Sequence, residues 1–371
     1  MRWISAIGMA VLAVLFQGCG SRFPVDAGQV MRIVPANPPL PDTVPGDIVP
    51  DDDVPGDGVP GDGVPGDGET LQITWHGTAS YELKLGDLSV LLDPFVSHQG
   101  LFHSVLGGTI RSDAERVRAT FGALDKPQGI FVAHAHWDHL MDVHQILALR
   151  DWSDVPVFGS PTAKNILLGY PSITEESLDF RTAQTCGSWQ KVTETPTSLV
   201  EYKAFKSGHA PHFLGIRLYD GVVDNPRDKA PRKAHHFKLG KIYAFALRLT
   251  QGETSYTVYF QSSASSWNAD SIPDGLETLK DVDVAILCVS GWNKVKNYPE
   301  GLIQQLEPAH ILLSHFDNFF QKRDLKNPAR PEVVPSARLQ GFLRKVQESI
   351  TYSHWQQIIA PDVGTTLRFE K

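Results

Sequence analysis

Four side chains of the kinds that bind metal ions fall within six residues of this 371-residue chain: His134, His136, Asp138 and His139. They directly follow the apolar run Gly129-Ile-Phe-Val-Ala133, which is typical of a buried β-strand. An extended segment points His134 and His136 the same way, and the turn that follows lets Asp138 and His139 converge beside them. Imidazoles with one carboxylate suit Zn²⁺, with Mn²⁺ or Fe²⁺ as the other candidates, and an open coordination position activates water near neutral pH. The spacing therefore predicts a metal site at a strand end, rather than a solvated histidine-rich loop.

The pattern His-x-His-x-Asp-His after a strand resembles the metallo-β-lactamase fold superfamily, and the resemblance extends from about residue 70 to the C-terminus. It implies an α/β fold, namely a four-layer αββα sandwich with the metals at one edge of the two sheets. The opening Ile73-Thr-Trp-His-Gly-Thr-Ala-Ser80 and the later Leu91-Leu-Asp-Pro94 look like the branch that contains N-acyl-phosphatidylethanolamine phospholipase D and the L-ascorbate-6-phosphate lactonases. In that branch a histidine is common at the position of Thr78.

The resemblance also implies where the other metal ligands lie. His209, in the stretch Gly-His-Ala-Pro-His, is similar to the third histidine of the family's first metal site. His315, after the apolar run Ile311-Leu-Leu-Ser314, is similar to the family's last histidine. The implied first site consists of His134, His136 and His209, and the implied second site consists of Asp138, His139 and His315.

Four side chains receive further roles near these sites. Asp93 ends a predicted strand and matches the family's first acidic motif, which implies that it holds a ligand histidine or the loop in place. Asp138 is expected to orient the attacking water in addition to binding the second metal. His212 and His76 are candidates for substrate contact, although loop histidines of this kind often have no role.

One element of the family is missing. The superfamily usually has Gly-Asp-Thr/Ser after a hydrophobic strand, and its aspartate bridges the two metals. Here the strand that ends at Phe260 runs into Gln-Ser-Ser-Ala, which puts Ser263, or Ser262 with a one-residue slip, at that position. A neutral hydroxyl cannot offset the repulsion between two dications about 3.5–4 Å apart. We therefore expect one tightly bound Zn²⁺ and a second that is weaker or absent, unless Asp270 or Asp274 replaces the missing carboxylate.

Apolar runs and turn residues predict the elements that must hold these side chains. The predicted strands cover residues 71–75, 79–85, 88–93, 199–205, 213–218, 242–250, 256–260, 282–289 and 311–314. The predicted helices cover residues 140–149, 161–168, 299–306 and 337–346, and a capping box at Ser112-Asp-Ala-Glu115 opens another that runs to about residue 124. Strands with helices in both halves suit a β-sandwich flanked by helices. The polar, basic residues 221–240 are interpreted as an insertion near the rim of the active site.

Residues 1–19 are interpreted as the signal peptide of an exported bacterial protein. Arg2 precedes an apolar run from Ile4 to Phe16 that is too short to span a bilayer, and Gly18-Cys19-Gly20 follows at once. This arrangement resembles a bacterial lipobox, in which Cys19 becomes lipid-modified and is the mature N-terminus. The alternative is an ordinary cleaved signal, because the two residues before Gly18 are not the usual ones. A lipid anchor implies the cell envelope, at the outer membrane or the periplasmic face.

Residues 20–69 are predicted to be a disordered tether between this anchor and a domain of residues 70–371. They are rich in Pro, Gly and Asp and poor in large apolar side chains, so they cannot form a core. A five-residue unit of the type Val-Pro-Gly-Asp-Gly recurs from Val44 to Gly68. As a flexible coil, about fifty residues reach roughly 40 Å, which suits a domain held off a membrane.

The charge of the chain disfavours nucleic acid as a partner. The formal net charge is −8, but residues 1–68 carry nine of the 42 acidic and three of the 34 basic residues, which leaves the remainder near −2. The domain therefore has no basic surplus to offset nucleic-acid phosphates.

Two cysteines remain outside the predicted anchor. Cys288 lies in the apolar run Val284–Val289, which favours a buried thiol. A disulfide between Cys186 and Cys288 is allowed in an exported protein but cannot be read from the sequence.

Together these features predict an exported, membrane-tethered, metal-dependent hydrolase that uses metal-activated water. The resemblance implies a phosphodiester, lactone, amide or ester substrate, which a tethered enzyme meets as a small diffusible or lipid-like molecule. The first alternative is an iron-dependent sulfur-oxidising enzyme with a mononuclear site on the same fold. The second is a non-catalytic envelope binding protein that keeps a structural metal. The missing bridging aspartate favours this second alternative, and the presence of the other ligands disfavours it.

Overall fold

The computed structural model describes residues 70–371 apart from residues 101–102, 105–106, 150–151, 186, 213–214, 322–330 and 335–336. The predicted signal peptide with Cys19 and the predicted tether lie outside the described residues. Within the part that the structure describes, no helix is long and apolar enough to cross a membrane.

The first of two sheets contains the strands that precede the metal motif. Its strands are β1 Leu71–Gly77, β2 Ser80–Leu85, β3 Leu88–Leu92, β4 Gly129–Phe131, β5 Val157–Gly159, β6 Phe180–Thr182 and β14 Thr366–Phe369. They lie in the order β14-β1-β2-β3-β4-β5-β6. The strands β1, β2 and β3 form an antiparallel meander, and β3 to β6 run parallel. The metal motif therefore follows a short parallel strand near the middle of a mixed sheet.

The second sheet mirrors this organisation. Its strands are β7 Gln190–Glu194, β8 Ser198–Lys206, β9 Tyr243–Gln251, β10 Thr254–Gln261, β11 Val284–Cys288, β12 His310–Ser314 and β13 Gln357–Ile359. They lie in the order β13-β12-β11-β10-β9-β8-β7. The strands β7 to β10 are antiparallel, whereas β10 to β13 are parallel.

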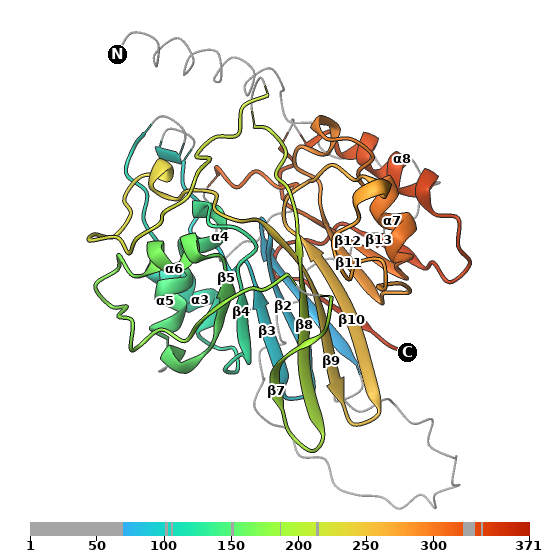
Figure 1. Ribbon diagram of the computed structural model, residues 1–371, viewed down its shortest axis with the longest axis horizontal. Coiled ribbons are helices and arrows are strands. Elements are labelled where there is room, and N and C mark those ends of the chain that lie inside the picture. Colours follow the sequence, from blue (N-terminus) through green and yellow to red (C-terminus); the bar gives the residue numbers. More distant parts are fainter. Residues whose placement is uncertain are drawn as a thin grey trace, which may run out of the picture.

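Helices cover the outer surfaces of both sheets (Figure 1). The first sheet packs against α3 Ala114–Phe121, α4 Trp137–Leu140, α5 Val143–Leu147 and α6 Pro161–Leu167. The second packs against α7 Glu300–Leu306 and α8 Leu339–Ser349. Short 3₁₀ turns occur at η1 Trp152–Asp154, η2 Ala234–His236, η3 Ala269–Ser271 and η4 Trp292–Lys294. Two mixed sheets between two helical layers confirm the predicted αββα sandwich, which is the architecture of the metallo-β-lactamase fold.

Aromatic side chains of both sheets pack around β4, the strand that precedes the metal motif. Phe131 of β4 stacks on Phe158 of β5 with ring centroids 4.6 Å apart, and it meets Phe245 of β9 edge-on at 5.3 Å. All three side chains are at most 1% exposed. Truncating a buried aromatic of this size costs about 3–5 kcal/mol. The end of β4 is therefore held from both sheets before the first ligand histidine begins.

Strand direction brings the predicted site residues to one edge. Within the first sheet β1, β3 and β4 point the same way, and within the second sheet β8, β10 and β12 do so. The amide of His315, after β12, donates to the carbonyl of Thr78, after β1, at 2.8 Å. The carboxyl ends of all six strands therefore share one edge of the sandwich, which is where ligands bind in sheets of this kind.

The predicted strand at residues 213–218 is wrong. Its described residues form a turn with one isolated bridge at Ile216, whose side chain is 58% exposed. Gly215 and Tyr219 have φ values of 77° and 59°, and such left-handed conformations interrupt an extended run. The described apolar residues Ile216 and Leu218 therefore do not form a sheet face.

The segment predicted as one helix at residues 140–149 instead covers the end of one short helix and the whole of another. The capping box predicted at Ser112 is also misplaced, because Asp113 is the N-cap. Asp142 separates α4 from α5, and its carboxylate accepts hydrogen bonds from the amides of residues 96–97 and from the hydroxyl of Ser112. Because Ser112 is engaged there, Asp113 becomes the N-cap of α3 instead. Long-range hydrogen bonds to one buried carboxylate therefore override the local helical pattern.

Cys288, at the end of β11, is the buried thiol expected from its apolar run. Its side chain is 1% exposed, and burial raises the pKa of the thiol to about 12. A thiol of this kind stays protonated and unreactive. Its possible partner Cys186 lies outside the described residues.

His76 packs within the fold rather than at the predicted substrate site. Its ring meets Phe121 of α3 edge-on, with centroids 5.1 Å apart, and the residue is 7% exposed. Burial lowers the pKa of His76 to about 4. The expectation of substrate contact is therefore not supported, because the ring belongs to the packing of α3 on the first sheet.

Replacing His76 by Leu is expected to make the protein less sensitive to acid. The folded-state pKa lies below the ordinary value of 6.5, so the unfolded chain binds a proton that the folded chain does not. The stability contributed by neutral His76 is present above pH 6.5 and is lost as the pH falls from there toward 4. At pH 5 the loss amounts to about 2 kcal/mol. Urea unfolding of chelator-treated protein at pH 7 and at pH 5 measures this difference in the free energy of unfolding.

His76→Phe is the matched control, because it changes the packing differently but also lacks the titrating group. Both variants should lose about 2 kcal/mol less than the wild type between the two pH values. An equal loss in all three proteins would show that His76 is protonated in the folded state.

Candidate metal centre

The metal motif begins two residues after β4 and is buried. His134, His136 and His139 are at most 3% exposed, and Asp138 is 7% exposed. His136 has an extended backbone and is the N-cap of α4, so the chain changes from strand to helix between the second histidine and Asp138. This change turns Asp138 and His139 back toward the strand end, as the spacing predicted.

The structure brings the three implied ligands of the first site together. His134, His136 and His209 each offer a ring nitrogen, and these atoms lie within 4.8 Å of one another. The ring centroids of His134 and His136 each lie 5.1 Å from that of His209. The Nε2 atoms of His134 and His136 are buried and have no hydrogen-bond partner among the described residues. Buried nitrogens that converge without partners fit a bound metal ion, and three imidazoles are a usual zinc donor set.

The three implied ligands of the second site also lie together. Asp138, His139 and His315 form a second group within 4.8 Å. The Oδ2 atom of Asp138 lies 3.3 Å from Nε2 of His315 and 3.6 Å from Nε2 of His139. This group offers a metal only one carboxylate, so its charge is poorly matched to a second dication.

Asp93 lies behind the ligands, where it positions His139. Its Oδ2 atom lies 2.7 Å from Nδ1 of His139, and its Oδ1 atom accepts the amide of Ala133 at 2.6 Å. The bond to Nδ1 directs Nε2 of His139 toward Asp138. A carboxylate in this arrangement sets the tautomer of a ligand histidine.

Hydrogen bonds around Thr78 hold the loop of His315 in place. Asp317, which is the acceptor at one end of this chain of bonds, was not found from the sequence. Both carboxylate oxygens of Asp317 accept the amide of Thr78 at 3.1 Å, and the carbonyl of Thr78 accepts the amide of His315 at 2.8 Å. Thr78 and His315 have positive φ values of 52° and 55°. No local pattern pairs residues 78 and 317, because they are joined only when the two sheets meet.

The position of the absent bridging aspartate falls at two serines after β10. The Oγ atom of Ser262 lies 3.5 Å from Nδ1 of His134, whereas Ser263 donates to the carbonyl of Gly208 at 2.9 Å. Ser262 therefore faces the metal ligands, and Ser263 supports the loop that carries His209. The structure therefore favours Ser262, the alternative alignment shifted by one residue, as the position of the missing aspartate.

Neither proposed substitute for that aspartate reaches the site. Asp270 and Asp274 are both exposed, and neither belongs to any group of potential metal ligands within the described ranges. Asp270 lies in the 3₁₀ turn η3. The structure therefore does not support the alternative in which one of them folds back to rebuild the bridge.

His212 and Tyr219 line the metal centre without belonging to the ligand groups. The ring of His212 stacks on that of His209 with centroids 4.7 Å apart, and it lies 5.6 Å from that of His136. Tyr219, which the sequence reasoning missed, faces His136 at 6.3 Å. Its left-handed backbone directly follows the segment that was predicted as a strand, so no periodic signal pointed to it.

The basic insertion packs over the metal motif. Residues 221–240 carry five Lys or Arg and two Asp. The amide of Ala135, between two ligand histidines, donates to the carbonyl of Leu239 at 3.1 Å, and the amide of Val223 donates to the hydroxyl of Thr162 in α6. The segment thus lies at the rim of the site, as its composition suggested, and gives that rim a positive charge.

The protonation states of the three first-site histidines and of Asp138 suit a divalent cation, whereas burial at His139 is outweighed by Asp138 and Asp93, which raise its pKa. Burial, and then the neighbouring imidazoles, hold the pKa of His134 and His136 well below the usual value, and burial lowers the pKa of His209 to about 3. Burial by itself raises the pKa of Asp138, but His139 and His315 outweigh it and hold that pKa below its usual range. Neutral imidazoles beside an ionised carboxylate are the forms that bind metal.

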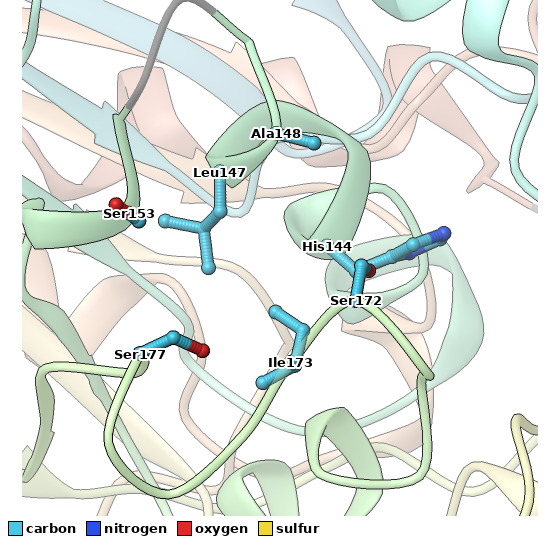
Figure 2. A pocket seen from close by; sticks show the side chains of 7 residues that line it. All are labelled: His144, Leu147, Ala148, Ser153, Ser172, Ile173 and Ser177. Carbon is cyan, nitrogen blue, oxygen red and sulfur yellow. The ribbon is translucent and has the colours of Figure 1, made fainter.

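A separate cavity of about 160 Å³ lies between α5 and the segment before β6 (Figure 2). His144, Ile173 and Ser177 are among the residues that line it. The ring of His144 stacks on Tyr170 at 3.7 Å, and its Nδ1 is bonded to the carbonyl of Met141. No residue that lines this cavity belongs to the ligand groups, and His144 packs against Tyr170.

Part of the sequence is similar to two curated bacterial proteins. The chain is 30% identical over 89 residues to a UPF0173 metal-dependent hydrolase of Roseobacter denitrificans, a match that covers 24% of this chain and 32% of that protein. It is also 30% identical over 105 residues to a UPF0173 metal-dependent hydrolase of a Ruegeria species, covering 28% and 37%. The chain thus spans about a third of the length of these relatives. No family model matches it.

Similar solved structures include two proteins of low sequence identity. Igni18, a metallo hydrolase of Ignicoccus hospitalis, is 16% identical with a TM-score of 0.45, and the match covers 81% of this chain and 99% of that one. The metallo-β-lactamase fold protein YhfI of Bacillus subtilis is 14% identical with a TM-score of 0.43, covering 81% and 100%. The finer resemblance to the branch with N-acyl-phosphatidylethanolamine phospholipase D stays a prediction.

Ser262→Asp is expected to strengthen binding of a second metal by at least about tenfold. A unit charge about 4 Å from a cation interacts with it by roughly 4 kcal/mol at an effective dielectric near 20, and desolvation of the new carboxylate offsets part of this. Titration of Zn²⁺ against a competing chelator should show one tight equivalent in the wild type and two in the variant.

Ser263→Asp is the matched control, since it adds the same charge one residue further along. The side chain at residue 263 points toward the carbonyl of Gly208, so no second tightly bound Zn²⁺ is expected in this variant. An equal gain in both variants, or two equally tight equivalents in the wild type, would contradict the assignment of Ser262 to the bridging position.

Proposed function

We propose that this protein is a metal-dependent hydrolase whose centre is formed by the two ligand groups after β4, β8 and β12. The observation that carries the proposal is the pair of buried, unpartnered Nε2 atoms of His134 and His136, which converge with His209. Buried polar atoms without partners are rare in folded proteins, so two that converge on one point need an explanation, and a bound metal ion provides it. The partial similarity to curated metal-dependent hydrolases supports the same class.

The side chains have distinct tasks in this proposal. A divalent metal bound by the three histidines supplies Lewis-acid polarisation of the substrate oxygen and a lowered pKa for water. Asp138, ionised and within 3.3 Å of His315, accepts a hydrogen bond from the attacking water and directs it. Asp93 holds His139 in the orientation that keeps its Nε2 next to Asp138. The enclosing sheet edge limits the entry of bulk water.

The substrate class that the site supports best is a phosphodiester. The basic rim of residues 221–240 attracts a negatively charged molecule toward a domain that is otherwise nearly neutral. Lactones, amides and carboxylic esters are the other classes that the resemblance implies. The low total charge of the domain continues to disfavour a long nucleic acid.

Zinc in the first site is the proposed cofactor, with Mn²⁺ or Fe²⁺ as the other candidates. Three imidazoles plus an open position suit Zn²⁺, and the second group lacks the bridging carboxylate that would balance another dication. The same lack favours the sulfur-oxidising alternative, which needs one iron. Metal analysis of protein purified without added metal separates the two, because dominant iron would support the alternative.

We also propose that the protein is exported and anchored to the bacterial envelope through Cys19. The support is the sequence alone: a basic start, a short apolar run and the Gly-Cys junction, followed by the repeat-containing segment. An anchored enzyme of this kind meets lipid-like or small diffusible substrates at the membrane surface.

The hydrolase proposal predicts metal-dependent cleavage of at least one chromogenic substrate. A panel of bis(p-nitrophenyl) phosphate, a lactone, an anilide and a p-nitrophenyl ester is assayed with Zn²⁺- or Mn²⁺-loaded protein. Asp138→Asn should lower turnover by about 10²–10⁴-fold, because it removes the proton acceptor, while the first metal stays bound.

Asp270→Asn is the control, since Asp270 is exposed and outside the ligand groups. It should leave both turnover and metal content unchanged. Tight metal binding without cleavage of any substrate class would favour the non-catalytic binding protein instead.

The anchor proposal predicts that the full-length protein, expressed in a bacterial host, partitions into the detergent phase. Cys19→Ala should move it to the aqueous phase, because lipidation requires the thiol. Partitioning that is the same for both proteins would rule out a lipid on Cys19.

A further inference from the structure

His212 is held beside the metal centre although it belongs to neither ligand group. Its ring stacks on that of His209 at an interplanar angle of 25° and lies 5.6 Å from the ring of His136. Both neighbours are ligands in the proposed first site. A substrate oxygen bound at that site therefore lies near the imidazole of His212.

The hydrogen bonds of His212 determine where its proton lies. The backbone amide of Leu218 donates to Nδ1 of His212 at 3.0 Å. An amide can only donate, so Nδ1 must carry a lone pair and cannot hold a proton. The ring is therefore neutral with its hydrogen on Nε2, and that tautomer is imposed by the backbone rather than by a titratable neighbour.

The backbone of His212 is fixed independently of its ring. Its amide donates to the carbonyl of Ile216 at 2.9 Å, and its carbonyl accepts a hydrogen bond from the ammonium group of Lys294. On the other side of this loop a Cβ added at Gly291 would lie 2.7 Å from that of Ala210, so the two loops are in close contact. The imidazole is thus positioned before any substrate arrives, which is the condition for useful electrostatic stabilisation.

These contacts decide which chemical role is open to His212. With its hydrogen on Nε2 and its Nδ1 lone pair occupied, the ring cannot accept a proton from water, so it is not a general base. A neutral Nε2–H remains as a hydrogen-bond donor. Such a donor stabilises the negative charge that develops on an oxygen during cleavage.

We propose that Nε2–H of His212 donates a hydrogen bond to a non-bridging oxygen of the substrate's phosphoryl group, next to the first metal site. The inference rests on the proposed function for the identity of the substrate class, but the tautomer and the binding of an oxyanion can be tested without catalysis. Inorganic phosphate is the probe, because it presents the same oxygens.

The first experiment determines the tautomer. Protein labelled with ¹⁵N-histidine, at pH 7.5 and with or without Zn²⁺, is studied by long-range ¹H–¹⁵N correlation, and His212→Gln assigns the signal. The spectrum should show His212 protonated on Nε2 alone, and phosphate added to the Zn²⁺-loaded protein should shift that resonance. A proton on Nδ1, or a resonance that phosphate leaves unmoved, would overturn the proposal.

The second experiment separates the donor from the ring. His212→Phe keeps a ring to stack on His209 but lacks the N–H, whereas His212→Gln keeps an N–H at similar reach but lacks the ring. With the metal content unchanged, phosphate should bind the Phe variant about 10- to 100-fold more weakly than the wild type, and the Gln variant within a few fold of it. Weakening in the Gln variant alone would show that His212 only packs.

The outcomes also distinguish this inference from the proposed function. If no substrate of the panel is cleaved but phosphate binds through His212, the hydrolase proposal fails and the donor role stands. If a phosphodiester is cleaved with equal turnover by the wild type and the Phe variant, the hydrolase proposal stands and the donor role fails.

Discussion

The carboxylate of Asp93 is the interaction on which the metal centre depends. It is fully buried, and its two oxygens accept hydrogen bonds from the amide of Ala133 and from Nδ1 of His139. One partner belongs to the end of β4 and the other to α4, so a single group sets both the strand spacing and the direction of a ligand imidazole. A buried carboxylate is costly unless it is paired, and these two bonds offset that cost. They tie the turn that follows β4 to the end of β3, beyond the parallel pairing of the two strands.

The second sheet is joined to the same edge by another buried carboxylate that accepts a backbone amide. Asp317 holds the amide of Thr78, and the carbonyl of Thr78 holds the amide of His315. Asp93, Thr78 and His315 all have positive φ values, which cost about 1–3 kcal/mol each outside glycine. Such conformations persist only where surrounding contacts define them; for Thr78 and His315 the contacts come from the opposite sheet, and for Asp93 they come from the end of β4 and from α4. Strain is therefore concentrated where the sheets meet and the ligands converge.

The sequence predicted the layers of the fold because long apolar runs and amphipathic helices record which faces are buried. Residues 71–92 and 242–261 show this clearly, since their meanders combine alternation with turn residues. The strands β5, β6, β7, β13 and β14 escaped prediction, because such short segments show no clear period unless they form a continuous apolar run, as β4 does. The helix break at Asp142 was not predicted for another reason. The backbone amides of residues 96–97, which donate to its carboxylate, lie more than forty residues earlier in the chain.

By itself the sequence determined the ligand types, their spacing after β4 and the loss of a bridging carboxylate, because these are local properties of residue identity. Only the tertiary structure decided which strand ends share an edge, and hence that His212 lies at the metal centre while His76 packs on a helix. It also decided that Ser262 rather than Ser263 faces His134. Successive side chains of an extended segment point to opposite sides, so a register uncertain by one residue leaves the facing side chain undetermined until the neighbouring strands are in place.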